Sequence, residues 1–545
     1  MKILTAVIGV ALALPGGAEA ARFAVGVAPG TDTDALAARL EARTGGSTSV
    51  IGSFAVELRA PSVRGVAGMP GVTYVERVTA RRRVAFLPTD PLFASRQWYL
   101  PAVRAFDFWP QRPYWLSPVK VAVIDSGIDG EHPEFRGGRI AAATTFVGGS
   151  AYRDTQGHGT FVAGLIAARM DNAEGIAGMA FPARLLVAKV VRPDGAVPLD
   201  AEARAIRWAA DRGAQVINLS LGGVRDPMNP DHDSYSALES SAVQYAVRRG
   251  AVVVAAVGNS ELAPDKPWPY ASYPAALPHV LGVSALARDG AVPMFSNRDP
   301  IYNDIAAPGD DLFSTIPRVL SAPHPTCVEQ GYSDCGPPEY RRPQGTSFAA
   351  AIVSAGAALV RSAWPTLTAD QVVWLLEHSA ADQTAVTGCR RCTDSRDSLT
   401  GWGRLDVSAA VDPRRAHPPA DKYETNDDAG SHAWRVARRR ATLRASIDYW
   451  DDQNDVYSVY LRKGQRLRAA LNGTPGTDVN LAIWKPGTRR VDELRYPSSR
   501  FFAKASSRPG AKERLRYRAD RKGRYFVQVK ISGPGFGGYK LQLFR

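Results

Sequence analysis

Beyond its first 20 residues, the sequence lacks any apolar run of the roughly 18 residues that a membrane-spanning helix requires. The first 20 residues differ: Lys2 precedes an apolar run at 3–14, and Ala18-Glu19-Ala20 ends the segment with small residues. This order is typical of a secretory signal peptide, although a buried N-terminal helix is an alternative. We therefore expect a signal peptide at 1–20 and a secreted protein without stable membrane insertion, either extracellular or periplasmic in a bacterium with two membranes.

Cysteine is also scarce, with four residues in two local pairs, Cys327 with Cys335 and Cys389 with Cys392. The spacing of the four cysteines is irregular, which argues against a zinc site. Export to an oxidising compartment favours two short-loop disulfide bonds instead. Four cysteines allow three pairings, and the sequence does not choose between them.

The chain is basic: it has 67 lysines and arginines, 53 aspartates and glutamates, and a formal net charge of +14. Basic chains can bind nucleic acid, but these arginines are scattered and no recognition motif accompanies them, so we expect no nucleic-acid partner. Two arginine triplets, at 81–83 and 438–440, are either solvated surface or exposed linker sequence open to cleavage.

The chain is too long for one compact core, and it shows no internal repeat. Its first folded part, 21–86, is predicted to be a small α+β domain. The expected elements are strands at 22–27, around 50–58 and near 72–75, a helix at 33–43 that Gly45 and Gly46 terminate, and a second, weaker helix before the last strand.

Residues 90–412 have the sequence pattern of an α/β domain, because short β-branched runs with apolar residues on both faces alternate with amphipathic helices. This predicts a three-layer fold with a mostly parallel central sheet. The expected buried strands lie at 119–124, 185–191, 216–219, 252–256 and 279–283. Residues 420–545 carry regularly spaced strands separated by glycine and proline, which predicts a C-terminal all-β sandwich.

Three segments of the middle part carry residues suited to acyl transfer. Asp125 ends a buried strand, His158 opens a helix between two glycines, and Ser347 opens another helix after Gly345-Thr346. Alone, each segment reads as an ordinary turn or helix cap. Together they supply a nucleophile, a base that takes its proton, and a carboxylate that fixes the tautomer of the base.

Asn259 follows the buried run at 254–257 and Gly258. A fixed side-chain N–H aimed at a developing oxyanion lowers the barrier to acyl transfer by about 3–4 kcal/mol. The backbone N–H of Ser347, at a helix N-terminus, is the expected second donor. The alternative for Asn259 is a turn residue at the end of a strand.

These segments resemble the subtilase family across residues 90–410. The matching segments are 121–127, 157–164, 220–223, 258–259 and 345–349. The chain order Asp, His, Ser is also the order in subtilisin. The resemblance implies a subtilisin-like fold and a serine endopeptidase that forms an acyl-enzyme on Ser347, with no cofactor for the chemistry and protein or peptide substrates. We expect a monomer.

The resemblance extends to the outer parts. Residues 21–86 look like the inhibitory propeptide that subtilases use as an intramolecular chaperone and then cleave, and 90–93 with 97–100 look like the start of a mature domain. Segments 423–427, 455–457 and 478–483 resemble, more loosely, the bacterial pre-peptidase C-terminal domain, a β-sandwich often removed during export.

Two features depart from the family pattern. Subtilases usually follow the nucleophile with Met-Ala and a nearby proline, whereas here Phe348-Ala349-Ala350-Ala351 has none, which suits a helix. An insertion at 318–344 carries Cys327 and Cys335 and ends just before the nucleophile segment. We expect a disulfide-bonded loop at the border of the cleft.

The family resemblance also assigns residues to substrate binding. Ser220, Leu221 and Gly222 are expected to form an extended edge that pairs with the substrate backbone, with the opposite edge near 194–196. Gly258 lies in the segment that lines the specificity pocket, and Trp268 is a candidate for its floor, favouring small or medium side chains.

A calcium site is implied in the same way. Glu134 and Asn172, with carbonyl oxygens near Met170, Glu174 and Ile176, match a family calcium loop, and oxygen ligands suit this hard cation. An ordinary polar turn is the alternative.

Two other functions compete with this interpretation. Asp125-Ser126-Gly127 resembles the signature of aspartic proteases, but that chemistry needs a second such carboxylate and no matching segment is present. The acid-acting relatives of subtilases would replace His158 with a carboxylate. An adhesive protein that retained the fold without turnover is the non-enzymatic alternative, and the presence of all four candidate catalytic residues argues against it.

Overall fold

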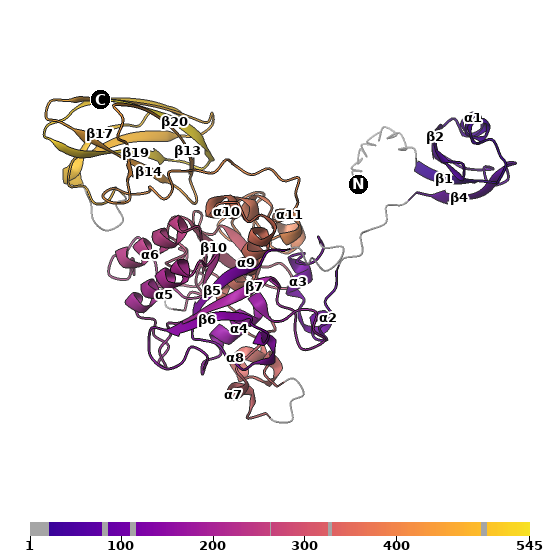
Figure 1. Ribbon diagram of the computed structural model, residues 1–545, viewed down its shortest axis with the longest axis horizontal. Coiled ribbons are helices and arrows are strands. Elements are labelled where there is room, and N and C mark those ends of the chain that lie inside the picture. Colours follow the sequence, from indigo (N-terminus) through magenta and orange to yellow (C-terminus); the bar gives the residue numbers. More distant parts are fainter. Residues whose placement is uncertain (1–20, 79–85, 109–115, 262, 325–329, 492–498) are drawn as a thin grey trace, which may run out of the picture. The chain divides into compact units, whose positions relative to one another are not determined.

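The computed structural model describes residues 21–545, except 79–85, 109–115, 262, 325–329 and 492–498 (Figure 1). The chain divides into two compact units, Met1–Val84 and Ala85–Arg545. The predicted signal peptide, the arginine triplet at 81–83 and Cys327 lie outside the described residues.

The first unit is a four-stranded antiparallel sheet with one helix. Its elements are β1 (Ala21–Val27), α1 (Thr33–Thr44), β2 (Ser47–Gly52), β3 (Ala55–Ala60) and β4 (Val72–Arg77), and the sheet order is β2-β3-β1-β4. The side chain of Asp32 accepts hydrogen bonds from two backbone N–H groups and begins α1, and Gly45, with φ 65°, ends it. Leu36 and Leu40 pack from α1 onto the sheet in a fully buried core.

Two details of this unit were predicted wrongly. The strand expected around 50–58 is a hairpin, because the chain turns between β2 and β3. The weaker second helix is a series of tight turns, in which Val66 donates to Val63 and Met69 donates to Val66. Gly65 lies there with φ 79°, a left-handed conformation that interrupts a right-handed helix.

The second unit begins with a seven-stranded parallel sheet of order β11-β10-β9-β8-β5-β7-β6. Its strands are β5 (Val119–Asp125), β6 (Ile140–Thr145), β7 (Ala183–Lys189), β8 (Val216–Leu219), β9 (Val252–Ala256), β10 (Val280–Leu286) and β11 (Ile305–Pro308). Every residue of β8, β9 and β10 is buried, as expected for a parallel sheet covered on both faces. The predicted three-layer α/β fold is therefore confirmed.

Ten α-helices are described in this part: α2 (Phe93–Arg96), α3 (Tyr99–Ala102), α4 (His158–Ala167), α5 (Leu199–Asp211), α6 (Ala237–Arg248), α7 (Arg318–Ser321), α8 (Pro338–Arg341), α9 (Thr346–Ala363), α10 (Ala369–His378) and α11 (Val407–Ala410). Short 3-10 turns lie at Pro133–Phe135, Ser333–Cys335 and Ala385–Thr387. α5 packs on α6, and α4 packs on α9.

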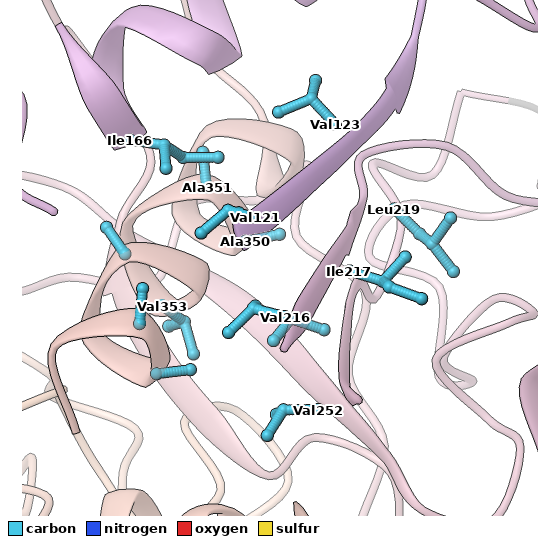
Figure 2. Packing of buried hydrophobic residues seen from close by; sticks show 14 of the residues in the cluster. Val121, Val123, Ile166, Val216, Ile217, Leu219, Val252, Ala350, Ala351 and Val353 are labelled. Carbon is cyan, nitrogen blue, oxygen red and sulfur yellow. The ribbon is translucent and has the colours of Figure 1, made fainter. Parts of the chain in front are cut away.

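α9 is the central helix of this part. Figure 2 shows Ala350, Ala351 and Val353 of α9 beside Val121 of β5 and Val216 of β8. Among the described helices, α9 alone is long and apolar enough to cross a membrane, yet 89% of it is buried inside the protein. Its apolar character therefore belongs to a core helix.

The C-terminal part is a β-sandwich, as predicted. One sheet has the order β12-β14-β19-β16-β17 and the other β13-β20-β15-β18. The strands are β12 (Trp434–Arg435), β13 (Arg440–Asp448), β14 (Asn454–Leu461), β15 (Arg466–Gly473), β16 (Val479–Trp484), β17 (Phe502–Ser506), β18 (Lys512–Arg518), β19 (Gly523–Ile531) and β20 (Phe536–Phe544), with a 3-10 turn at Ser499–Phe501. One buried cluster joins the two sheets, for example through Leu443 and Val527.

Candidate active site

The structure brings Asp125 and His158 together at the carboxyl end of β5, an interior strand of the sheet. Asp125 is the last residue of β5, and His158 is the first residue of α4. A Cβ on Gly159 would lie 2.2 Å from the carbonyl oxygen of Gly127, so only glycine lets α4 approach the strand end this closely. The glycine after the histidine thus sets the distance between the two side chains.

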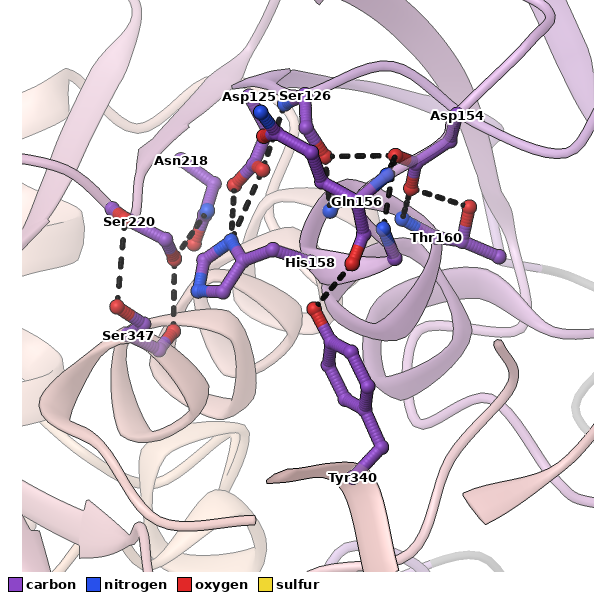
Figure 3. Close-up of polar contacts among 12 residues, drawn as sticks. Asp125, Ser126, Asp154, Gln156, His158, Thr160, Asn218, Ser220, Tyr340 and Ser347 are labelled. Carbon is purple, nitrogen blue, oxygen red and sulfur yellow. Dashed lines mark hydrogen bonds and ion pairs between the residues drawn. The ribbon is translucent and has the colours of Figure 1, made fainter. Parts of the chain in front are cut away.

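The imidazole of His158 faces the carboxylate of Asp125. Nδ1 of His158 lies 2.9 Å from both carboxylate oxygens, and Asp125 is buried (Figure 3). Burial alone would lower the pKa of His158, but the charge and hydrogen bond of Asp125 outweigh it, and the pKa is raised above its ordinary 6.5. With Nδ1–H donating to the carboxylate, Nε2 of the neutral ring is left as an acceptor.

A second buried carboxylate, Asp154, holds this arrangement in place. Its Oδ1 accepts hydrogen bonds from the backbone N–H groups of Gln156 and Gly157 and from the hydroxyl of Ser126. Its Oδ2 accepts from the N–H and hydroxyl of Thr160. Asp154 therefore satisfies the orphan donors at the start of α4, immediately before His158. The sequence analysis did not identify this residue.

Ser347 lies in the first turn of α9, on the other side of His158 from Asp125 (Figure 3). Its backbone carbonyl accepts a hydrogen bond from the hydroxyl of Ser220 at 2.7 Å. Its own hydroxyl donates to the carbonyl of Ser220 at 3.3 Å. In proteases without substrate, the hydrogen bond between the nucleophile and the base is often long or absent. A hydroxyl of Ser347 that bonds to Ser220 can therefore turn to His158 when substrate binds.

Asn259 is fixed by Thr346, the residue before Ser347. The amide oxygen of Asn259 accepts from the backbone N–H of Thr346 at 2.8 Å and from its hydroxyl at 2.9 Å. This fixes the orientation of the amide and turns its N–H donors to the other side, where Nδ2 lies 3.5 Å from the position a Cβ would take on Gly345. The side chain is thus held at the N-terminus of α9.

A cavity of about 180 Å³ adjoins Ser347 and Asn259. It is lined by all four residues predicted for substrate binding, Ser220, Leu221, Gly222 and Gly258. Trp268 also lines it and is buried, while residues 194–196 form a separate tight turn and are not among its described lining residues.

Gly222 also has a structural reason within the protein, in addition to the predicted role in substrate binding. A Cβ on Gly222 would lie 2.4 Å from the carbonyl oxygen of Tyr273. The next residue, Gly223, forms an antiparallel bridge with Tyr273 through two hydrogen bonds of 2.9 Å. The absence of a side chain therefore allows this close contact within the protein.

The insertion at 318–344 packs against the start of α4. The hydroxyl of Tyr340 donates to the carbonyl of Gln156 at 2.7 Å, and its ring stacks on Phe161 with centroids 5.9 Å apart (Figure 3). Phe161 in turn contacts Phe348, whose ring lies 5.5 Å from that of His158. The predicted loop thus reaches the vicinity of the candidate base.

The cysteines follow the prediction as far as the structure describes them. Cys389 and Cys392 form a disulfide bond with their Cα atoms 5.3 Å apart. Cys335 is also disulfide-bonded, and its predicted partner Cys327 lies outside the described residues.

The predicted calcium loop holds buried oxygen atoms that lack hydrogen-bond partners. Oε1 of Glu134 accepts from Ile176 N–H and from the hydroxyl of Tyr332, but Oε2 has no partner. Burial raises the pKa of Glu134 to about 7. The Nδ2 atom of Asn172 is also buried and unpartnered, while its Oδ1 accepts from the N–H of Glu174 at 3.1 Å.

Asp90 is a third side chain of this loop, and the sequence analysis missed it. Its Oδ2 accepts from the N–H of Asp171 at 2.7 Å, and its buried Oδ1 has no partner. Burial also raises the pKa of Asp90. Asp90 and Glu134 fit an oxygen-ligated cation, because each presents a buried carboxylate oxygen that nothing else in the described residues satisfies. Asn172 would add its amide oxygen only if the amide turned away from the N–H of Glu174.

Known proteases are similar to this chain in sequence. A sequence profile described as the subtilase family matches residues 117–403. Thermitase from Thermoactinomyces vulgaris is 36% identical over 234 residues, which are 43% of this chain and 77% of thermitase. Subtilisin DY from Bacillus licheniformis is 33% identical over 314 residues, which are 57% of this chain and 97% of subtilisin DY. The crystal structure of MycP1 with its N-terminal propeptide removed is 27% identical and aligns with a TM-score of 0.47, over 59% of this chain and 99% of MycP1.

Proposed function

The chain belongs to the subtilase family and is a serine endopeptidase, and from this premise we propose that it cleaves proteins through an acyl-enzyme on Ser347. His158 acts as general base and then as general acid, and Asp125 orients His158. Asn259 donates a hydrogen bond to the oxyanion. The observation that carries these roles is the pair of 2.9 Å contacts between His158 Nδ1 and the Asp125 carboxylate.

In the first step, Oγ of Ser347 attacks the carbonyl carbon of the peptide bond and its proton passes to Nε2 of His158. Asp125 stabilises the imidazolium that forms. When the tetrahedral intermediate collapses, the C–N bond breaks and His158 gives its proton to the departing amine. Water then repeats the sequence on the ester, with His158 again taking a proton, and releases the acid product and free Ser347.

The oxyanion of the intermediate is stabilised from two directions. Because the oxygen of the Asn259 amide is held by Thr346, its Nδ2 donors are oriented before the reaction begins. The backbone N–H of Ser347, in the first turn of α9, supplies the second donor, and the partial positive charge of the helix terminus adds to it.

Phenylmethylsulfonyl fluoride, which sulfonylates activated serines, tests the assignment of the nucleophile. We expect one label per molecule, located on Ser347 by peptide mapping, together with loss of casein hydrolysis. Ser347→Ala should abolish both, whereas Ser241→Ala, on the surface of α6, should retain both. A label on another serine, or casein hydrolysis by Ser347→Ala, would refute the assignment.

The substrate is proposed to be an extended peptide that pairs with the edge at 220–222, with one side chain in the cavity of about 180 Å³. Trp268 occupies part of that cavity, so small and medium side chains should be preferred at the cleaved bond. A peptide library cut by the wild type and by Trp268→Ala should show a shift to larger side chains in the variant. An unchanged profile would remove Trp268 from the specificity pocket.

A structural calcium ion is proposed at Asp90, Glu134 and Asn172. When bound, the ion would neutralise two buried carboxylates, and the three side chains would serve only to hold it. In the Ser347→Ala background, which prevents self-digestion, EDTA should lower the melting temperature of the parent but not of Glu134→Gln or Asp90→Asn. An equal effect of EDTA on all three proteins would exclude this site.

We also propose that residues 1–20 direct secretion and that 21–86 inhibit the enzyme until they are cut away. The protein is then a zymogen that matures outside the cytoplasm, as a monomer, with 420–545 as a separate β-sandwich domain. Mass spectrometry of the secreted wild type should find an N-terminus near residue 90, while Ser347→Ala should retain 21–86. Removal of 21–86 from the inactive variant would show that another protease performs the cleavage.

A further inference from the structure

Two buried carboxylates and one half-buried carboxylate meet where the α/β part contacts the sandwich. Asp304 precedes β11 and Glu377 lies near the end of α10, both in the α/β part, whereas Asp451 lies in the turn between β13 and β14. One carboxylate oxygen from each lies within 4.8 Å of the other two. Two oxygens bound to one calcium ion at about 2.3–2.6 Å can be separated by up to about 5 Å, so the trio has the spacing of a shared ion.

One carboxylate oxygen of Glu377, Oε1, has no hydrogen-bond partner among the described residues. The residue is 2% exposed. A buried polar atom without a partner costs about 1–3 kcal/mol, and more when it is charged. This oxygen belongs to the same side chain that approaches Asp304 and Asp451, so its missing partner points to a ligand between them.

The fixed charges around the trio leave it negative. Arg396 lies 3.2 Å from Asp304, and its guanidinium also donates to the carbonyl groups of Pro300, Ile301 and Asn303, which hold it on that side. Asp448 adds a further carboxylate close enough to affect Asp451. Four carboxylates against one guanidinium require additional positive charge if all are ionised.

A second group of carboxylates at the same boundary differs from the trio, because a histidine side chain lies among them. His279, 2% exposed, lies between Asp370 at 3.1 Å and Asp427 at 3.0 Å. Burial opposes the charged form, but Asp427 and Asp370 raise the pKa of His279 well above its ordinary value. Among the described ion pairs, no histidine or lysine neutralises Glu377 or Asp451.

We propose that Asp304, Glu377 and Asp451 bind a calcium ion that joins the sandwich to the α/β part. Three carboxylates with no nitrogen or sulfur ligand suit a hard divalent cation rather than zinc. Asp451 also lines cavities of about 480 and 750 Å³ at the boundary, through which an ion and its remaining water ligands can enter. This ion is distinct from the one proposed at Glu134.

The proposed ion would add to an aromatic contact at the same boundary. The rings of Trp402 and Trp450 have centroids 5.2 Å apart, and Arg396 lies 4.8 Å from the ring of Trp450. His378 contacts Phe536 at 4.9 Å. These contacts bring the two parts together, and the ion would remove the repulsion between carboxylates that opposes them.

The position of Trp450 beside Asp451 provides a specific probe. We expect the calcium-free Ser347→Ala chain to bind terbium with emission sensitised by tryptophan, and calcium to displace it. Asp451→Asn and Glu377→Gln should each weaken this binding at least tenfold, since even the loss of a residue that only supports a ligand costs about 10–100-fold. Asp370→Asn is the matched control, because it removes the same charge from the same boundary and should retain binding.

Calorimetric titration with calcium supplies a second measurement. Asp451→Asn and Glu377→Gln should each bind one calcium ion fewer than the parent. Glu134→Gln should lose a different ion, so the double variant Glu134→Gln/Asp451→Asn should bind two ions fewer. Circular dichroism identifies any variant that fails to fold. Equal stoichiometry and affinity in the parent and in both folded variants would overturn the proposal. The proposal would also be overturned if, at about pH 8, the parent bound no ion and Asp451→Asn melted at a higher temperature than the parent. That result would mean that protons, and not a metal ion, hold the cluster together.

Discussion

Two glutamates buried between α5 and α6 should limit the stability of the α/β part at alkaline pH. Glu202 and Glu239 are 5% and 4% exposed, and Oε1 of Glu202 has no hydrogen-bond partner. Burial raises the pKa of Glu239 from 4.5 to about 7. Burial, followed by the charge of Glu239, raises the pKa of Glu202 well above its ordinary value. The two carboxyl groups are therefore stable only while they hold protons.

The size and sign of the effect follow from linkage. A carboxyl whose pKa is higher in the folded state than in the unfolded state contributes no penalty below the unfolded value of 4.5, and its penalty grows until the pH reaches the folded value of about 7. Each pKa unit corresponds to about 1.4 kcal/mol, so ionisation of Glu239 costs the fold about 3 kcal/mol above that pH. Glu239→Gln removes this cost and keeps the side-chain shape.

The assay is urea-induced unfolding of the Ser347→Ala chain with and without Glu239→Gln, followed for the transition of the α/β part at about pH 5 and about pH 8. Glu239→Gln should raise the free energy of unfolding by about 3 kcal/mol at the higher pH and by much less at the lower pH. Glu339→Gln, on the exposed face of α8, is the control and should change neither value. An equal effect of Glu239→Gln at both pH values would refute the reasoning.

Further predictions concern the site and the disulfide. Asn259→Leu should lower kcat by about 100–1000-fold with little change in KM, and a loss below tenfold would exclude it as an oxyanion donor. The pKa of His158 is lowered by burial and raised by Asp125, then by the charge of Asp154, and last by the charge of Glu261. Glu261→Gln should therefore move the acid limb of kcat/KM to slightly lower pH. The shift should vanish in about 1 M salt, and persistence there would contradict a charge effect. Replacing Cys389 and Cys392 with serine should lower stability by about 2 kcal/mol, as expected for so short a loop, and an unchanged melting temperature would show that the bond is not stabilising.

The sequence predicted the centre of the sheet better than its edges. β8 and β9 have the predicted bounds, because both are continuous apolar runs buried on two faces. The edge strands were not predicted. β6 consists of alanine and threonine after its first residue and is only partly buried, and β11 has four residues and ends in proline. Such segments become strands because a neighbouring strand offers hydrogen bonds, which composition alone does not reveal.

The same limit applies to the site. Asp125, His158 and Ser347 could be proposed from the sequence because each lies in a short segment whose pattern is local. Asp90 and Asp154 have no such pattern, and their roles arise from contacts: Asp90 reaches Asp171, 81 positions away, and Asp154 gathers donors at the start of α4. Buried carboxylates are therefore the residues that the sequence analysis missed and the structure recovered.

The place of β5 in the middle of the sheet has a consequence for the growing chain. β5 is the first strand of its sheet to be synthesised, yet it pairs with β7 and β8, and the helix α9 that carries Ser347 contacts β5, β8, β9, β10 and β11. Such long-range topology folds slowly, because distant segments must meet before their contacts stabilise them. On a ribosome, Asp125 and His158 emerge well before Ser347. With Ser347 as the proposed nucleophile, the enzyme cannot cut anything, itself included, until nearly the whole α/β part has been made.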